Sequence, residues 1–244
     1  MAFIDTVAAS EARGEVLAMY ARQQAAYGYV PNYAGVFSHR PEVMERWGRL
    51  LAAIKRPMSA RRFELVTVAA SLALRNSYCA LAHGGKLAGI VDADTVRAIA
   101  EGAADGILSD EELAIVSFAR KVATDASQVA AEDVDALKAY GLDDDGIFDI
   151  VAAAAARAFF TKVLDGLGVE ADACFREMNP ELAGSLVVGR AVAEHESERL
   201  PGSETEAPGT VPAFAPPPVE IPPSRGGVPA ASIACRQAPT AASS

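Results

Sequence analysis

The sequence predicts an all-α fold, and three observations support this prediction. First, apolar residues before Leu200 recur at the spacing of one helix face, as Val16, Leu17 and Tyr20 do in the first predicted helix. Second, no stretch alternates apolar and polar residues in the way that marks a half-buried strand. Third, 51% of the residues are hydrophobic and only 7% are aromatic, and the many alanines allow helices to pack closely.

Turn and capping residues define the predicted helices in the first half of the chain. Pro31, in the sequence GYVPN, has no N–H group to donate and ends the first helix. The pair Arg56-Pro57 breaks a later helix, and Ser59 is placed to cap the one after it. That helix, about residues 60–74, is apolar on most faces apart from its start and one glutamate, so we expect it to be buried.

Capping signals also define the helices of the second half. Ser109 and Glu112 have the spacing of a capping box, and Gly141 ends the helix that follows. The acidic triplet Asp143–Asp145 opens a long helix, because the helix dipole favours negative charge at an N-terminus. A last helix is expected after Gly168. The predicted helices span about residues 10–27, 33–38, 41–54, 60–74, 78–88, 92–102, 109–124, 131–140, 143–167 and 171–198.

A sharp change of composition near Leu200 divides the chain. Residues 1–198 are predicted to form one helical domain, which is long enough to bury a sizeable core. Residues 199–244 contain most of the prolines, in runs such as APPPVEIPPS, and have few large apolar side chains to bury. We therefore predict a disordered, Pro/Ala/Ser-rich tail, partly polyproline-like, with Cys235 inside it.

The charge and hydropathy of the chain exclude several kinds of partner. A formal net charge of −10 brings no gain from counterion release on phosphates, so nucleic acid is not expected as a partner. The same charge disfavours anionic lipid, and the most apolar stretch, Ile147–Phe160, is too short and too charged to span a bilayer. With no secretory signal visible, no membrane partner is predicted and the expected location is cytoplasmic.

The three cysteines, Cys79, Cys174 and Cys235, give no sign of a disulfide framework or of a metal site. Their number is odd, and no signal directs the chain to an oxidising compartment. No CxxC pair is present, so a structural zinc site has no support. We predict neither a metal nor a cofactor.

Cys79 and His83 are the candidate chemical residues. They are four residues apart in the segment ELVTVAASLALRNSYCALAHGG, so on a helix they share one face. Cys79 would lie in the first turn of its helix, where N–H groups and the helix dipole stabilise a thiolate and lower the thiol pKa. The imidazole would take the thiol proton, and the thiolate would attack a peroxide or another electrophile.

Glu64 joins this pair only if the chain reverses direction. It precedes Cys79 by fifteen residues, which is roughly 22 Å along a continuous helix at about 1.5 Å per residue. A helix break near Asn76-Ser77 would let two helices pack together and bring Glu64 to His83. Simpler alternatives stay open at this point: Cys79 as a small buried core residue, and Glu64 as a first-turn acid that faces solvent.

At these positions the sequence resembles the carboxymuconolactone decarboxylase-like, or alkylhydroperoxidase D-like, superfamily, in its peroxidase-related branch. The family pattern is a Glu, a CxxC that begins twelve residues later, and a His four residues after the second Cys. Glu64, Cys79 and His83 match the Glu, the second Cys and the His. Tyr78 falls where some members carry a further His of a proton relay. The resemblance covers roughly residues 10–175 and implies the helical bundle of this family, assembled as a homo-oligomer.

One departure from the family pattern limits the chemistry. Asn76 replaces the first Cys, which in dithiol members resolves the oxidised second Cys as a disulfide. An asparagine side chain cannot form a disulfide, so the intramolecular cycle is lost. The catalytic residues that the resemblance implies are Cys79, His83, Glu64 and Tyr78.

Three functions are compatible with these residues. The first is a peroxidase-related, peroxiredoxin-type antioxidant oxidoreductase, in which Cys79 reduces a hydroperoxide, becomes a sulfenic acid and is restored by an external thiol. The second is a non-redox decarboxylase or lactone-processing enzyme that acts on an organic acid, with His83 as the acid/base. The third is a helical oligomer without catalysis. Whether Cys174 or Cys235 resolves Cys79 stays open.

Overall fold

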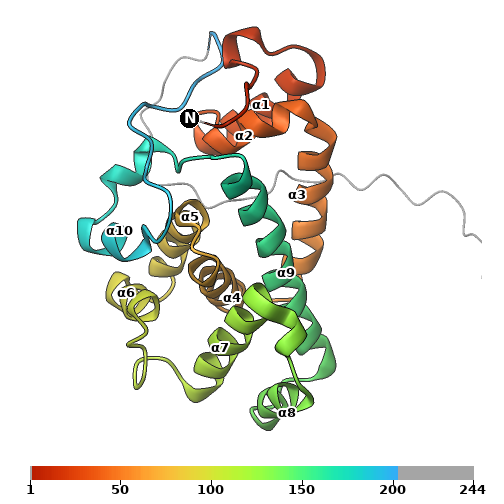
Figure 1. The fold of residues 1–244 in the computed structure, drawn as a ribbon, viewed down its shortest axis with the longest axis vertical. Coiled ribbons are helices and arrows are strands. Elements are labelled where there is room, and N and C mark those ends of the chain that lie inside the picture. The colour runs from red at the N-terminus through yellow and green to blue at the C-terminus, as the bar shows by residue number, and fades with distance from the viewer. Residues whose placement is uncertain (1, 203–244) are drawn as a thin grey trace, which may run out of the picture.

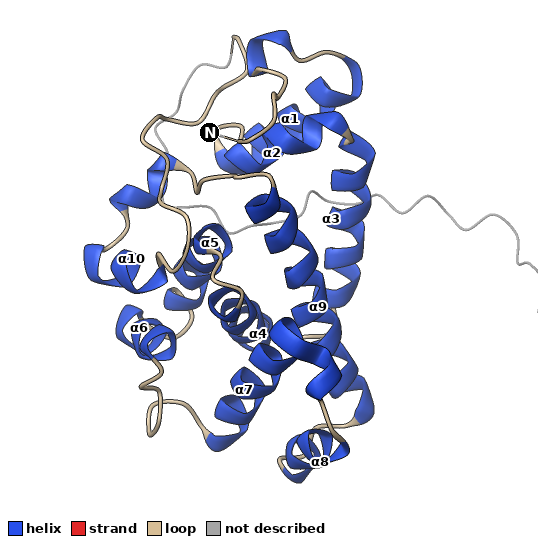
Figure 2. Ribbon diagram, in the orientation of Figure 1, coloured by secondary structure: helices blue, strands red, loops and turns tan. Residues whose placement is uncertain are grey.

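The computed structural model describes residues 2–202, which form a multi-helix bundle (Figure 1). The predicted all-α class is confirmed: the described residues contain helices and no β-strand, with one backbone bridge between Ala171 and Val192 (Figure 2). The α-helices are α1 (Gly14–Tyr27), α2 (Asn32–Val36), α3 (Pro41–Lys55), α4 (Ala60–Ala73), α5 (Ser77–Ala88), α6 (Ala93–Glu101), α7 (Asp110–Asp125), α8 (Ala131–Ala139), α9 (Asp144–Gly166) and α10 (Pro180–Leu186). Short 3-10 helices lie at residues 9–11, 37–39, 126–128 and 173–177.

The predicted capping residues begin three of the helices. Ser59 accepts a hydrogen bond from the Arg62 N–H at the start of α4. Ser109 and Glu112 form a reciprocal capping box at the start of α7, and the Asp143 carboxylate caps α9. These bonds satisfy N–H groups that have no partner inside the helix, so they fix where each helix begins.

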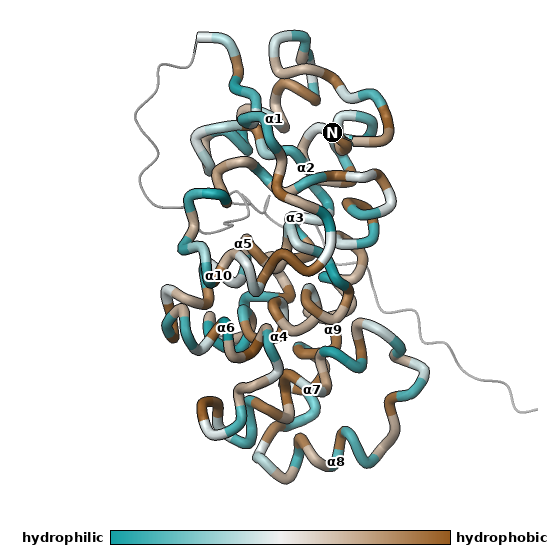
Figure 3. Tube along the Cα trace, turned by 60° about the vertical axis from the view of Figure 1, so that its left-hand side comes forward, coloured by the Kyte–Doolittle hydropathy of each residue, from teal (hydrophilic) through white to brown (hydrophobic). Residues whose placement is uncertain are grey.

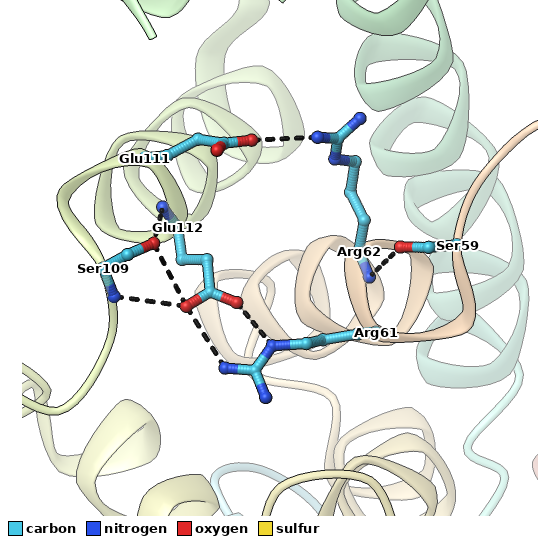
Figure 4. A network of polar contacts seen from close by, with 6 residues as sticks. All are labelled: Ser59, Arg61, Arg62, Ser109, Glu111 and Glu112. Carbon is cyan, nitrogen blue, oxygen red and sulfur yellow. Dashed lines mark hydrogen bonds and ion pairs between the residues drawn. The ribbon is translucent and has the colours of Figure 1, made fainter.

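Two ion pairs join the first turns of α4 and α7 (Figure 4). Arg61 donates two hydrogen bonds to Glu112, one from Nε at 2.5 Å and one from Nη2 at 3.2 Å. Arg62 Nη2 donates to Glu111 Oε1 at 2.9 Å. Because Glu112 is also the acidic residue of the capping box, one side chain fixes both the start of α7 and its pairing with α4.

Helix α4 lies at the centre of the bundle, against α5, α7 and α9 (Figure 1). Its residues 63–72 are all buried, as we expected for a helix that is apolar on most faces. Figure 3 shows hydrophobic stretches through the middle of the molecule, where α4, α5 and α9 lie. Neither the long α9 nor any other described helix is long and apolar enough to cross a membrane.

The prediction of a continuous last helix over residues 171–198 is wrong. A short 3-10 helix, α10 and an irregular segment that passes α1 take its place (Figure 1). Pro180 disfavours helix at Asn179, which caps α10 instead of continuing a helix. Further on, Gly189 packs so closely on the turn before α5 that an added Cβ would lie 2.0 Å from the Arg75 carbonyl oxygen.

The described chain ends against α1. The Leu200 N–H donates to Gln24 Oε1 at 2.6 Å, and the Val30 N–H donates to the Glu198 carbonyl at 2.8 Å. The tail that we predicted to be disordered, residues 199–244, lies outside the described residues except for 199–202.

Candidate active site

The predicted helix break is a tight turn between α4 and α5. Helix α4 ends at Ala73, and α5 begins at Ser77. Between them Arg75 adopts a left-handed backbone conformation with a φ of 57°. The Asn76 N–H donates to the Ser71 carbonyl at 3.0 Å. The chain therefore reverses direction, and the two helices pack against each other as the interpretation of Glu64 requires.

Asn76 caps α5 and sets the position of Cys79. The Asn76 Oδ1 accepts a hydrogen bond from the Cys79 N–H at 2.8 Å. Asparagine is a favoured capping residue because its side-chain oxygen satisfies an N–H group in the first helical turn. The residue at the position of the family's first cysteine thus has a structural function, and Cys79 lies in the first turn of α5 as predicted.

The structure brings Glu64 and His83 together. Glu64 Oε2 lies 2.6 Å from His83 Nδ1, and the two side chains are only 3% and 2% exposed. Burial alone would raise the pKa of Glu64, but interactions with His83, Lys86 and Lys55 hold that pKa at about 2. The Lys55 ammonium lies 3.9 Å from the second carboxylate oxygen. Glu64 is therefore a buried, ionised carboxylate, and the alternative of a solvent-facing acid is excluded.

Arg157 of α9 joins His83 to Cys79, although the sequence did not single it out as a site residue. Its side chain is 1% exposed. Nη2 lies 2.8 Å from His83 Nε2, and Nη1 lies 3.4 Å from Cys79 Sγ. An arginine nitrogen only donates, so His83 Nε2 accepts and Nδ1 carries the hydrogen that is donated to Glu64. The result is a buried hydrogen-bonded chain from Glu64 through His83 and Arg157 to Cys79.

His83 is neutral in this setting. Burial lowers its pKa, the charges of Arg157 and Lys86 lower it further, and Glu64 opposes them, with a resulting pKa of about 3. Burial also lowers the pKa of Lys86, three residues further along α5, to about 7. Because Arg157 donates to His83 Nε2, the lone pair that would take the Cys79 proton is already in use.

The environment of Cys79 differs from the expected one. The side chain is 3% exposed, and this burial raises the thiol pKa; the charge and hydrogen bond of Arg157 lower it but offset only part of the effect. The prediction of a lowered pKa at the helix N-terminus is wrong for this structure. Burial destabilises the thiolate by more free energy than the helix N-terminus and Arg157 restore. In this structure Cys79 is therefore a buried thiol with a raised pKa.

Tyr78 belongs to a second buried network, centred on Asp172. Its hydroxyl donates to Asp172 Oδ2 at 2.5 Å. The Asn32 N–H and the Ser197 hydroxyl donate to Oδ1 of the same carboxylate at 2.7 and 2.9 Å. Burial and the charge of Asp172 raise the pKa of Tyr78 well above its usual range. Three of the four predicted site residues are thus brought together, while the Tyr78 hydroxyl is directed to other partners.

Cys174 is attached to the edge of this second network. Its sulfur lies 3.2 Å from the Tyr29 hydroxyl, which in turn lies 3.3 Å from Asp172. Cys79 and Cys174 are both free thiols, and Cys235 lies outside the described residues. In the described chain no group of three or more His, Cys, Asp or Glu side chains is arranged to hold a metal ion.

The comparison with known families decides the classification. Residues 41–121, which contain Glu64, Cys79 and His83, match the carboxymuconolactone decarboxylase family. These residues belong to that family. No curated protein sequence matches the chain.

The chain shares its fold with three solved structures. An alkylhydroperoxidase AhpD-core, peroxidase-related protein from Ralstonia eutropha JMP134 is 22% identical, with a TM-score of 0.59, over 78% of this chain and 98% of that chain. A peroxidase-related protein from Silicibacter sp. TM1040 is 18% identical, with a TM-score of 0.62, over 71% and 93%. A cysteine-to-alanine variant of the debrominase Bmp8, in complex with 2,3,4-tribromopyrrole, is 18% identical, with a TM-score of 0.56, over 69% and 91%. The predicted superfamily is confirmed, and the debrominase shows that this fold has more than one function.

The carboxymuconolactone decarboxylase segment ends before Arg157, the residue that completes the site. Its signal in the sequence is a single cation within the apolar run Ile147–Phe160, where an unpaired buried charge would be costly. In the sequence, the charge of Arg157 indicated only that this apolar stretch does not span a membrane. Asp172 has no comparable signal, because its partners come from distant parts of the chain.

Proposed function

We propose that the protein is a peroxidase-related oxidoreductase in which Cys79 reduces hydroperoxides as a single thiol. One observation carries the proposal: the buried guanidinium of Arg157 donates to the Cys79 sulfur at 3.4 Å. A cation in this position stabilises the thiolate, which is the nucleophilic form of cysteine. The carboxymuconolactone decarboxylase segment and the peroxidase-related fold neighbours support the same class of reaction.

Glu64 and His83 act in this proposal as a positioning pair for the arginine. The ionised Glu64 accepts from His83 Nδ1, which fixes the tautomer whose Nε2 accepts from Arg157. The guanidinium is then held with one nitrogen on the sulfur. His83 therefore positions the guanidinium and is not the direct base that we expected from its spacing to Cys79, because Arg157 stays protonated and passes no proton from the thiol to the imidazole.

The thiolate attacks the terminal oxygen of a hydroperoxide. An S–O bond forms and the O–O bond breaks; the sulfur is oxidised to a sulfenic acid, and the proton released by the thiol ends on the departing alcohol oxygen. One thiol and one hydroperoxide thus become a sulfenic acid and an alcohol. Because Asn76 replaces the resolving cysteine, an external thiol attacks the sulfenic sulfur, forms a mixed disulfide with Cys79 and releases the oxygen as water. A second external thiol then attacks the outer sulfur, breaks the S–S bond and restores the Cys79 thiol.

The non-redox alternative, with His83 as a general acid/base, has less support from the geometry. Both ring nitrogens of His83 are hydrogen bonded in a buried setting. Its pKa of about 3 keeps it unprotonated near neutral pH, so it has no extra proton to donate. A substrate would first have to displace Arg157 from Nε2.

Mass spectrometry after a stoichiometric hydroperoxide pulse tests the proposal. Dimedone, which traps sulfenic acids, should label Cys79 in the wild-type protein and in Cys174→Ser, and should leave Cys79→Ser unlabelled. Turnover of 2,3,4-tribromopyrrole or of a lactone, with no label on Cys79 after the peroxide pulse, would replace the proposal with another reaction. An inert Cys79 without turnover would favour the non-catalytic alternative.

We also propose that two copies of the chain associate through a groove between α3 and α9. The groove has a volume of about 640 Å³ and a largely apolar lining, to which Trp47 contributes. Leu50 and Phe159 on its walls are 54% and 45% exposed. Glu42 and Arg46, which form an ion pair with each other, also line the groove, so these two charges balance on this face. Two chains of net charge −10 repel each other, so a face that is apolar and whose charges cancel is a suitable place for a second copy to bind.

A further inference from the structure

Two buried polar groups near Cys79 lack hydrogen-bond partners. The hydroxyl of Thr67 on α4 and the Nε–H of Arg157 have no partner within residues 2–202, although both are shielded from solvent. Each of the two side chains is 1% exposed. Buried polar groups are nearly always paired, because an unpaired one loses its hydration without compensation. Unpaired buried atoms of this kind mark places where a polar ligand can bind.

The α4–α5 hairpin places Thr67 at the level of Cys79. The hydrogen bond between Glu64 and His83 sets the register of the two antiparallel helices. From that bond, Thr67 is three residues closer to the turn on α4, and Cys79 is four residues closer on α5. Both residues therefore lie about one helical turn from the Glu64–His83 contact. At a spacing of three residues, Thr67 shares the face of α4 that carries Glu64 toward α5.

The Nε–H of Arg157 flanks the same sulfur. Nη1 of this side chain lies 3.4 Å from Cys79 Sγ, and Nη2 is bonded to His83. Because the guanidinium is a small rigid plane, Nε lies within about 6 Å of the sulfur. Nη1 and Nη2 are thus bonded to protein groups, and the Nε–H is left as a donor that can bind a ligand.

We propose that the Thr67 hydroxyl and the Arg157 Nε–H form a two-point subsite that holds the two oxygens of a hydroperoxide against Cys79. This inference rests on the function proposed above and names the residues that orient its substrate. A threonine hydroxyl both donates and accepts, which suits the terminal O–H of the hydroperoxide. The Arg157 Nε–H only donates, which suits the oxygen that becomes negatively charged as it departs.

The subsite stabilises the bond changes of the reaction. While the sulfur bonds to the terminal oxygen, the Thr67 hydroxyl oxygen accepts a hydrogen bond from the O–H of that oxygen, which keeps its hydrogen in the sulfenic acid. As the O–O bond breaks, its electron pair passes to the second oxygen, where Arg157 Nε–H stabilises the charge until the thiol proton arrives. The sulfur supplies both electrons, so this step consumes no other reductant.

Thr67→Val tests the subsite with little disturbance, because valine keeps the branched shape and lacks the hydroxyl. We expect the rate constant of Cys79 with hydrogen peroxide and with cumene hydroperoxide, followed by dimedone trapping, to fall about tenfold or more. Alkylation of Cys79 by iodoacetamide should keep its rate, because it reports the thiolate and needs no peroxide subsite. The thermal unfolding midpoint should not fall, since no protein hydrogen bond is lost. Thr67→Ser, which retains the hydroxyl, should react with peroxides as the wild type does.

Ser71→Ala is the matched control for this experiment. Ser71 is buried one turn further along α4, and its hydroxyl donates to the Thr67 carbonyl at 2.7 Å. The variant should lose stability and keep its peroxide rate. A wild-type peroxide rate in Thr67→Val would overturn the subsite and leave the proposed function intact. Equal losses with peroxide and iodoacetamide would also overturn it, because they would report access to the thiol. If wild-type Cys79 forms no sulfenic acid, the subsite and the proposed function both fail.

Discussion

At the scale of single residues, burial decides what each group of the site can do. Glu64, His83 and Arg157 are each at most 3% exposed, so their charges are stabilised by neighbours and hardly at all by water. The carboxylate and the guanidinium are linked through a neutral imidazole that bonds to both. Burial also raises the pKa of Cys79, with Arg157 as the main opposing influence. Arg157 therefore controls how much thiolate can form.

Arg157→Met should make Cys79 markedly less reactive. Without the cation, nothing comparable opposes the effect of burial, so the thiol pKa should rise further. A rise of one pKa unit lowers the thiolate fraction about tenfold below the pKa. Iodoacetamide alkylation measured across neutral and alkaline pH should show this shift. Arg157→Lys keeps a charge but loses the fork that bonds both partners, so it should be intermediate. The same pH profile in Arg157→Met and wild type would contradict this role.

His83 should make stability depend on pH in the acid range. Its pKa is about 3 in the folded protein, below the ordinary value of 6.5. Between these values the unfolded chain binds a proton that the folded chain does not, so the free energy of unfolding falls as the pH drops from 6.5 toward 3. For one group the slope approaches about 1.4 kcal/mol per pH unit. Urea unfolding at several pH values should show a smaller slope in His83→Gln; equal slopes would argue against a buried neutral imidazole.

At the scale of elements, the α4–α5 hairpin was the part of the site most accessible from sequence. The break near Asn76 and the approach of Glu64 to His83 follow from helix geometry, because both concern neighbouring segments. The contact of Arg157 with Cys79 joins residues 78 positions apart, and no local pattern states which face of α9 meets α5. The prediction of one helix over residues 171–198 failed for a related reason, because the conformation of this segment depends on its packing against turns that are distant in the sequence.

Asn76→Cys should give the hairpin a disulfide cycle. Residue 76 caps α5, with its side-chain oxygen 2.8 Å from the Cys79 N–H, so a thiol there would lie beside the oxidised sulfur. After a hydroperoxide pulse we expect the dimedone label to disappear and the mass to fall by about two daltons, as one disulfide forms. Loss of the cap should cost about 1 kcal/mol of stability. Asn76→Ser keeps a capping oxygen and should still be labelled. A persistent label in Asn76→Cys would show that the two side chains do not meet.

At the scale of the whole molecule, composition and capping residues were enough to predict the all-α bundle, and the family pattern was enough to place it in its superfamily. The fold class rests on features that repeat along the chain, and the family pattern rests on residues that lie within 20 positions of one another, from Glu64 to His83. The pairing of α3 with α9, which leaves an apolar groove on the surface, is a long-range result that sequence periodicity does not determine. The groove nevertheless supports the prediction of a homo-oligomer, because it offers a specific surface on which a second copy can bind.

This groove should be covered by a second copy in solution. Helix α9 turns Phe159 toward the groove and Arg157 toward the buried site, so an interface on its outer face would also hold the arginine in register. Leu50→Glu places a charge in the apolar lining, and light scattering should show a monomer where the wild type is a dimer or larger. Ile107→Glu is the matched control: Ile107 is 52% exposed, close to the 54% of Leu50, but does not line the groove. Its assembly should be unchanged. A wild-type monomer would contradict the interface.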